Sequence, residues 1–295
     1  EGRNAGKGLF HAAARIEDGV VRFDPGWPAA VDLDARVDFV ADGFRVDGSA
    51  RLGEVPVSSL RAGIASFGDA PLRVDATFAA DATPVLALLR ASPLREGREE
   101  ILDGLAASGP LRASFGMVLP LGSDDAGDGL RVDGRVDLAG ARLEETRWKI
   151  AFDDVRGEAR YGQSGFIADG LRVRHDGQPG LLSLRAGDGH VQARGMAFEA
   201  ALEAELDSSE LAARAPELAW LGARLEGRSA WTLALGLPED ADADVGGGRL
   251  QLRSDLVGTR LSLPEPLGKP APEPLAARID LKLPLGEDDI DVVLG

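Results

Sequence analysis

The chain has 295 residues, a length that allows one large all-β domain or two smaller domains. Its formal net charge of −16 argues against nucleic acid and anionic headgroups as partners, because both are bound through basic patches. The chain contains no cysteine, which excludes disulfides and thiol chemistry. Hydrophobic residues make up 44% of the chain but aromatic residues only 5%, which favours a smooth apolar surface over a thick core.

The dominant pattern is an alternation of apolar and polar residues, clearest over residues 31–39, 130–138 and 279–285. Successive side chains of a β-strand point to opposite faces, so each segment has one apolar and one charged face. We therefore predict a mainly β fold, in which an elongated, twisted antiparallel sheet forms an open apolar groove. The residues predicted to line the groove are Val31, Leu33, Val37, Phe39, Leu130, Val132, Val136, Leu138, Ile279, Leu281 and Leu283.

In chain order, residues 8–80 have the features of a strand meander, with glycines and the turn Asp24-Pro25-Gly26 between strands. A short helical insertion is predicted at about 84–107. Thr83-Pro84 and Ser92-Pro93 each combine an N-cap residue with a first-turn proline, and leucine and isoleucine follow at helical spacing.

Strand patterns return over residues 110–206, and a second short helical insertion is predicted at about 208–222. Strands resume at Leu225 and continue to the end of the chain. A proline-rich stretch at 264–274 interrupts them and is interpreted as a linker.

Residues 1–295 are interpreted as one continuous β-groove segment, with a division into sub-units 1–206 and 223–295 as the alternative. The sequence begins at Glu1 instead of Met and ends directly after the apolar run 292–294. It shows no signal peptide and no run of about 20 apolar residues that would form a transmembrane helix. We therefore expect an internal segment of a longer polypeptide.

Residues capable of catalysis or metal binding form no recognisable constellation. The histidines, His11, His175 and His190, are far apart and lie in no catalytic or zinc-binding motif. The alternating aspartates of residues 240–244 imitate the start of a calcium loop, but other residues occupy the positions of its required glycine and glutamate. We therefore predict no catalytic residue, no metal site and no cofactor, and a protein that is not an enzyme.

Several short motifs occur in an order that is more specific than any one of them. They are Asp18-Gly19, Phe23, Pro25 and Trp27-Pro28; Leu86 to Leu89, Ser92-Pro93-Leu94 and Leu102; Pro120-Leu121, Gly157, Gly165-Phe166 and Gln178-Pro179-Gly180; and Ser254 to Gly258, Leu261, Leu263-Pro264 and Pro266 to Lys269. Together they resemble the YhdP branch of the AsmA-like proteins of Gram-negative bacteria, most strongly over residues 17–185 and 250–270.

This resemblance implies a longer protein with a periplasmic body and an inner-membrane anchor outside this chain. It implies a repeating β-groove whose apolar concave side carries phospholipid acyl chains between the inner and outer membranes. The family brings no catalytic residues and no cofactor, and the resemblance specifies no envelope protein partner. The residues leave open an alternative, a structural or scaffolding β module of the envelope that carries no lipid.

Overall fold

The computed structural model describes residues 10–23, 25–68, 70–96, 99–121, 129–146, 149–213, 218–238, 247–264, 268–283 and 290–295. The features named above that lie outside the described residues are Asp24, residues 240–244, Pro266 and Leu267. The chain divides into two compact units. Unit 1 is Glu1–Ala151 with Glu158–Gln163, and unit 2 is Phe152–Gly157 with Ser164–Gly295.

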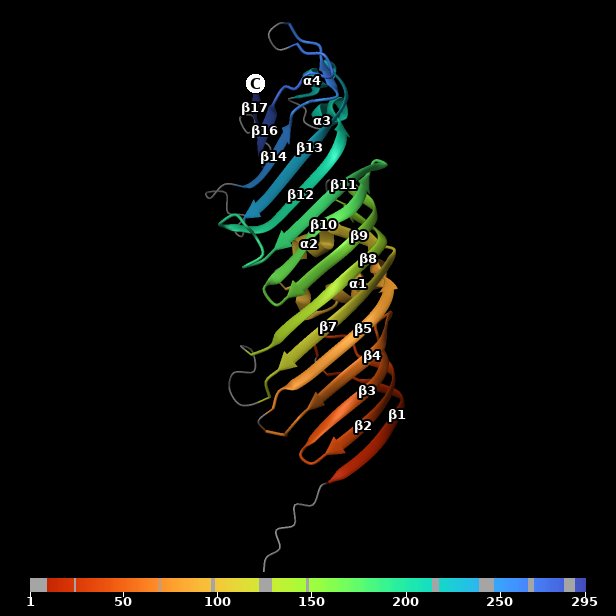
Figure 1. Ribbon diagram of the computed structural model, residues 1–295. Coiled ribbons are helices and arrows are strands. Elements are labelled where there is room, and N and C mark those ends of the chain that lie inside the picture. The colour runs from red at the N-terminus through yellow and green to blue at the C-terminus, as the bar shows by residue number, and fades with distance from the viewer. Residues whose placement is uncertain are drawn as a thin grey trace, which may run out of the picture. The chain divides into compact units, whose positions relative to one another are not determined.

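Unit 1 begins as the predicted meander, in which each strand pairs antiparallel with the one before it (Figure 1). Its strands are β1 (His11–Val21), β2 (Ala30–Val40), β3 (Gly43–Leu52), β4 (Val55–Ile64) and β5 (Leu72–Asp81). After a helical insertion come β6 (Leu105–Ser108), β7 (Pro110–Leu119), β8 (Arg131–Glu145) and β9 (Ile150–Gly162). β7 pairs with β5 and β8, and β9 contributes residues to both units.

The first helical insertion consists of α1 (Ala82–Arg90), the 3₁₀ turn η1 (Pro93–Arg95) and α2 (Glu99–Gly104). Asp81, not the predicted Thr83, is the N-cap of α1: its carboxylate accepts from the Thr83 amide, while the Thr83 hydroxyl donates to the Ala107 carbonyl. The predicted cap at Ser92 is confirmed. The helices end at Gly104 and not near 107, because β6 pairs with the part of β8 that extends beyond β7.

Unit 2 continues the antiparallel pattern with β10 (Gly165–His175), β11 (Gln178–Ala186) and β12 (Met196–Asp207). The second insertion contains α3 (Ser208–Ala213) and α4 (Ala219–Gly222), within the predicted range. The remaining strands are β13 (Leu225–Pro238), β14 (Gly248–Ser254), β15 (Thr259–Leu261), β16 (Ala277–Leu283) and β17 (Ile290–Leu294). Over the described residues, the prediction of a mainly β fold with an open antiparallel sheet and short helical insertions is confirmed.

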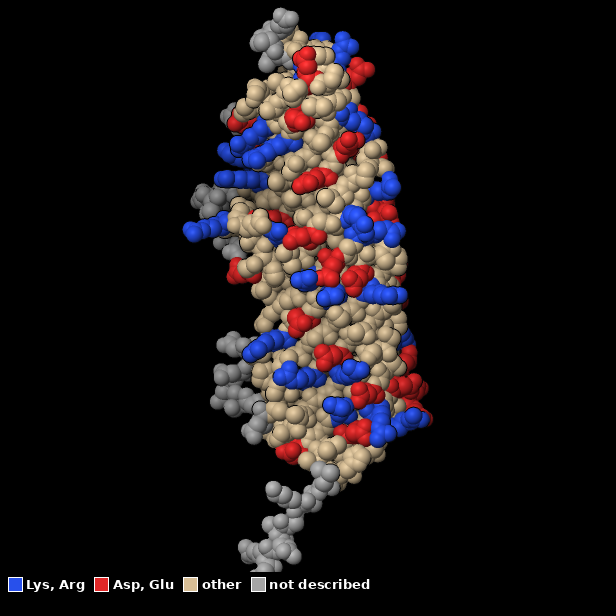
Figure 2. Space-filling view, in the orientation of Figure 1, with Lys and Arg blue, Asp and Glu red and all other residues tan. Residues whose placement is uncertain are grey.

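The strand registers give the sheet one apolar and one charged face, since directly paired residues of antiparallel strands share a face. Between β7 and β8, the apolar face holds the pairs Leu111–Leu138, Ala113–Val136 and Met117–Val132, and the charged face holds Arg112–Asp137 and Ser114–Arg135. Figure 2 shows the charged side, on which residues of both signs are interspersed.

Many ion pairs of the charged face join residues two positions apart on one strand. Arg36 Nε lies 2.6 Å from Asp38 Oδ2 on β2, and Arg278 Nε lies 2.6 Å from Asp280 Oδ2 on β16. Residues two apart on a strand point the same way, so these contacts need no particular neighbouring strand. Exposed pairs of this kind add little to stability, and they keep the face hydrated.

Candidate functional site

The candidate site is the apolar face of unit 1. We call its most continuous line of cross-strand partners the first row; it runs Val37–Val46–Ala62–Val74–Met117–Val132 from β2 to β8. Val37 and Val132, predicted from distant parts of the sequence, are its two ends. Val46, Val74 and Met117 are half-buried. The first row is therefore an apolar line across six strands.

A second row lies beside the first and runs Ala35–Gly48–Leu60–Ala76–Phe115–Gly134. Leu33, another predicted residue, packs with Ala35 and Ala50 in a buried cluster and is only 5% exposed. Phe39 lies at the end of β2, where its ring centroid is 6.2 Å from that of Phe44. These positions agree with the alternation in the sequence.

The predicted position of Val31 on the apolar face is corrected, because the structure places this residue on the charged face. It pairs directly with Arg51, whereas the next recorded pair is Asp34 with Ser49, so β2 carries one extra residue here. Asp32 in this bulge has φ of +50°. A bulge reverses the alternation on its far side, which a strict two-residue period does not anticipate.

The predicted residues of β8 lie in two different surroundings. Leu130 precedes the strand, which begins at Arg131, and it is half-buried. Val136 and Leu138 pack against a buried cluster of Ala82, Leu111 and Ala113, to which Val85 of α1 also contributes. α1 therefore covers the apolar face at this end of the strands, where the side chains form an ordinary core.

An aromatic cluster at the second row was not predicted. A Cβ on Gly134 would lie 2.3 Å from the ring of Tyr161, so that ring lies over the glycine. The Tyr161 hydroxyl donates to the Ser114 carbonyl at 3.1 Å, and burial together with the nearby Asp133 carboxylate raises its pKa to about 12. A glycine inside an alternating strand was the available signal, since such positions often mark a close approach.

Trp27 adds to this cluster from the connection between β1 and β2. Its ring centroid is 6.4 Å from that of Phe115 in an edge-on arrangement, and 5.9 Å from that of Phe23. This contact joins two residues that are 88 positions apart in the sequence, and strand periodicity does not predict contacts over such a separation.

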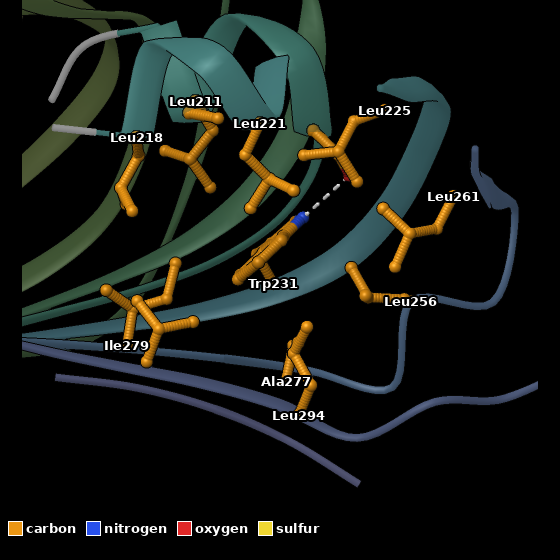
Figure 3. A pocket seen from close by; sticks show the side chains of 13 residues that line it. Leu211, Leu218, Leu221, Leu225, Trp231, Leu256, Leu261, Ala277, Ile279 and Leu294 are labelled. Carbon is orange, nitrogen blue, oxygen red and sulfur yellow. Dashed lines mark hydrogen bonds between the residues drawn. The ribbon is translucent and has the colours of Figure 1, made fainter. Parts of the chain in front are cut away.

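In unit 2, the predicted residue Ile279 lies in a closed apolar layer. Leu211 and Leu221 of the second helical insertion and Trp231 of β13 surround it, together with Leu218, about a cavity of only about 30 Å³ (Figure 3). That volume has room for water-sized groups but not for an acyl chain of lipid length. Ile279 and Leu281 are 8% and 7% exposed, and Leu283 is half-buried opposite Gly248.

A buried hydroxyl network fixes this layer beneath α3. The Thr259 hydroxyl oxygen lies 2.7 Å from that of Ser208 and 2.6 Å from that of Ser229. Trp231 Nε1 donates to Ser208 Oγ at 3.3 Å. Buried polar groups are costly unless they are hydrogen-bonded, so this network favours one arrangement of the layer.

The stretch interpreted as a linker at 264–274 is, in its described part, packed into the same layer. The backbone of Lys269 exchanges two hydrogen bonds with Leu261, and its ammonium donates to the Thr259 carbonyl at 2.5 Å and the Pro270 carbonyl at 3.1 Å. Burial lowers the pKa of Lys269. A Cβ on Gly268 would lie 2.3 Å from the Leu263 carbonyl oxygen. Proline content suggested a linker, but these contacts give the stretch a structural role.

The described residues contain no group of three or more His, Asp or Glu side chains placed to hold a metal ion. Within them, no helix is long and apolar enough to cross a membrane. His11 lies on β1, His175 at the end of β10 and His190 in a turn.

The registers and surroundings define the class of protein: a large open antiparallel sheet with one charged face, one apolar face and short helices over parts of the apolar face. The chain belongs to the YhdP family, described as YhdP protein, which it matches over residues 3–295. This confirms the resemblance drawn from the motifs.

The chain is also similar to the intermembrane phospholipid transporter YhdP of Escherichia coli (strain K12), with 26% identity over 280 residues. The matched region covers 92% of this chain and 21% of the relative, so the chain spans about a fifth of that protein. No solved structure matches the chain.

Proposed function

We propose that this chain is a non-catalytic segment of an envelope-spanning lipid conduit, in which the apolar face of unit 1 shields phospholipid acyl chains between the inner and outer membranes. The proposal places the segment in the periplasm, within a protein anchored in the inner membrane outside this chain. The observation that carries it is the first row, an apolar line across six strands of a chain whose E. coli relative is a phospholipid transporter.

The energetics of lipid transfer require such a surface. Each acyl methylene exposed to water costs about 0.8 kcal/mol, so an acyl chain of lipid length costs on the order of 10 kcal/mol to move uncovered. Beyond the end that α1 covers, residues 115–119 of β7 span about 17 Å, slightly more than the roughly 15 Å that one leaflet contributes to a bilayer core. A face one strand wide therefore has room for an extended acyl chain.

The charge distribution agrees with this use of the two faces. The charged face carries paired arginines and carboxylates in contact with water, so a lipid headgroup at the edge of the apolar face remains hydrated. The net charge of −16 keeps the segment from binding anionic membrane surfaces in place of single lipids.

The second candidate function is a structural or scaffolding β module without lipid cargo. The closed layer around Ile279 and Trp231 favours it for that part of unit 2, because helical side chains occupy the apolar face there. Both candidates need no catalytic group.

The test is direct recovery of cargo. We expect organic extraction of the purified protein, followed by mass spectrometry, to yield phospholipid, whereas an acidic control protein prepared in the same way yields none. Incubation with vesicles of phosphatidylethanolamine and phosphatidylglycerol should load additional lipid. A protein that carries no phospholipid and takes none from vesicles would favour the scaffolding function.

A further inference from the structure

The connection between β1 and β2 brings Trp27 over the apolar face of unit 1, and we call its described residues, 22, 23 and 25–29, the strap. In the sheet, β3, β4 and β5 separate β2 from β7. Trp27 of the strap nevertheless contacts Phe115 of β7, with ring centroids 6.4 Å apart. The strap therefore spans three strands and meets the second row, directly beside the first.

The surface that receives Trp27 is built for a ring. Phe115 pairs across the sheet with Ala76 on one side and Gly134 on the other, so neither neighbour competes for the space above it. The Tyr161 hydroxyl donates to the Ser114 carbonyl, and the Tyr161 ring lies over Gly134 and bounds this space on the β8 side. Trp27 thus occupies a position on the apolar face that an acyl chain would also fill.

The strap is held at this point by ring contacts of modest strength. Beyond the burial of its own area, an edge-on aromatic pair contributes about as much as the burial of one or two methylene groups. Phe23, the other ring against Trp27, is 51% exposed, so the strap is not sunk into a core. An acyl chain of lipid length that replaced Trp27 would bury far more apolar surface than the ring pair does.

We propose that the strap is a movable cover, and that the contact between Trp27 and Phe115 opens when an acyl chain occupies the apolar face of unit 1. This inference rests on the proposed lipid function and adds to it a segment that controls access of acyl chains to the apolar face. Trp27 is the residue whose displacement admits cargo, and Phe115 is the surface it vacates.

Cross-linking tests whether the strap must move. The chain has no cysteine, so Trp27→Cys with Phe115→Cys creates the only two thiols, which a reducible bis-maleimide can join across the contact. We expect phospholipid uptake from phosphatidylethanolamine vesicles to fall several-fold in the cross-linked protein and to recover on reduction. The single-cysteine variants treated with the same reagent are the controls. Equal uptake before and after reduction would overturn the inference.

A second measurement leaves the wild-type side chains in place. In protein containing 5-fluorotryptophan, Trp27→Phe identifies the fluorine signal of Trp27 among the four tryptophans. A short-chain phosphatidylcholine below its micelle concentration should shift the Trp27 signal and leave that of buried Trp231 unchanged. Bound lipid with an unmoved Trp27 signal contradicts the strap inference alone, whereas a wild-type protein that binds no lipid overturns the proposed function and the strap with it.

Discussion

Tyr161 shows how a single residue reports on the apolar face. It is the only tyrosine of the chain, and its ring lies over Gly134 while its hydroxyl reaches a backbone carbonyl. Burial favours the neutral phenol, and the Asp133 carboxylate disfavours a second negative charge nearby. The folded-state pKa is therefore raised above the unfolded value.

We predict that titration of the tyrosine absorbance gives a midpoint of about 12 in the folded protein and about 10 in urea. Because the pKa is raised on folding, the stabilisation is complete below the unfolded pKa and is lost as the pH rises through the folded one. Asp133→Asn should lower the folded midpoint by removing the neighbouring charge. A folded midpoint near that of free tyrosine would mean that the Tyr161 ring is not buried on the apolar face.

At the scale of elements, Asp81 joins β5, α1 and β7. Its Oδ1 accepts from the Thr83 amide at 2.9 Å, and its Oδ2 accepts from the Gly109 amide at 2.8 Å. These two hydrogen bonds, that from the Thr83 amide first, lower the pKa of the carboxyl group. One exposed carboxylate thus caps the helix and fixes the chain where it re-enters the sheet.

We predict that Asp81→Asn lowers the melting temperature by a few degrees at neutral pH, because the amide can accept from Thr83 but not also from Gly109. A lowered folded-state pKa gives stability that is present above the unfolded pKa of about 4 and lost as the pH falls through the folded value. The difference between wild type and variant should therefore shrink in acid. Asp75→Asn, on the charged face of the same strand, is the control, and an equal loss there would remove the special role of Asp81.

Across the whole molecule, apolar segments with the same sequence pattern are covered by different elements. α1 covers Val136 and Leu138 in unit 1, and the helical insertion of unit 2 covers Ile279. Val74 in the first row is half-buried between Ala62 and Met117. A charge introduced beneath a helix and a charge introduced in the first row should therefore have different consequences.

We predict that Val136→Glu costs on the order of 3 kcal/mol or more of unfolding free energy, because the carboxylate would be buried against α1. Val74→Glu should change the melting temperature little, since water can reach the first row, but it should reduce the phospholipid recovered per mole of protein. Arg135→Glu and Arg73→Glu, their neighbours on the charged face, should do little to either quantity. If Val74→Glu melts as low as Val136→Glu, the first row is a closed core.

Sequence alternation predicts which residues lie on each face of the sheet, but it does not predict which segments cover the apolar face. Both outcomes have physical causes. Alternation is local, so it correctly placed Leu33, Val37 and Val132 on one face. The bulge at Asp32 breaks the period without changing the residue types, so alternation alone predicts the wrong face for Val31. The contact of Trp27 with Phe115 depends on the strand order, which periodicity does not encode.

The ion pairs within single strands have a consequence for how such a sheet can change over evolutionary time. Arg36 with Asp38 and Arg278 with Asp280 each form an ion pair within one strand. Duplication or loss of a neighbouring hairpin would therefore leave these pairs in place, whereas it would break a cross-strand pair such as Arg135 with Glu158. Where its ion pairs lie within one strand, the charged face allows the chain to lengthen or shorten by one hairpin at a time. The apolar partners and the cross-strand ion pairs must then be matched anew.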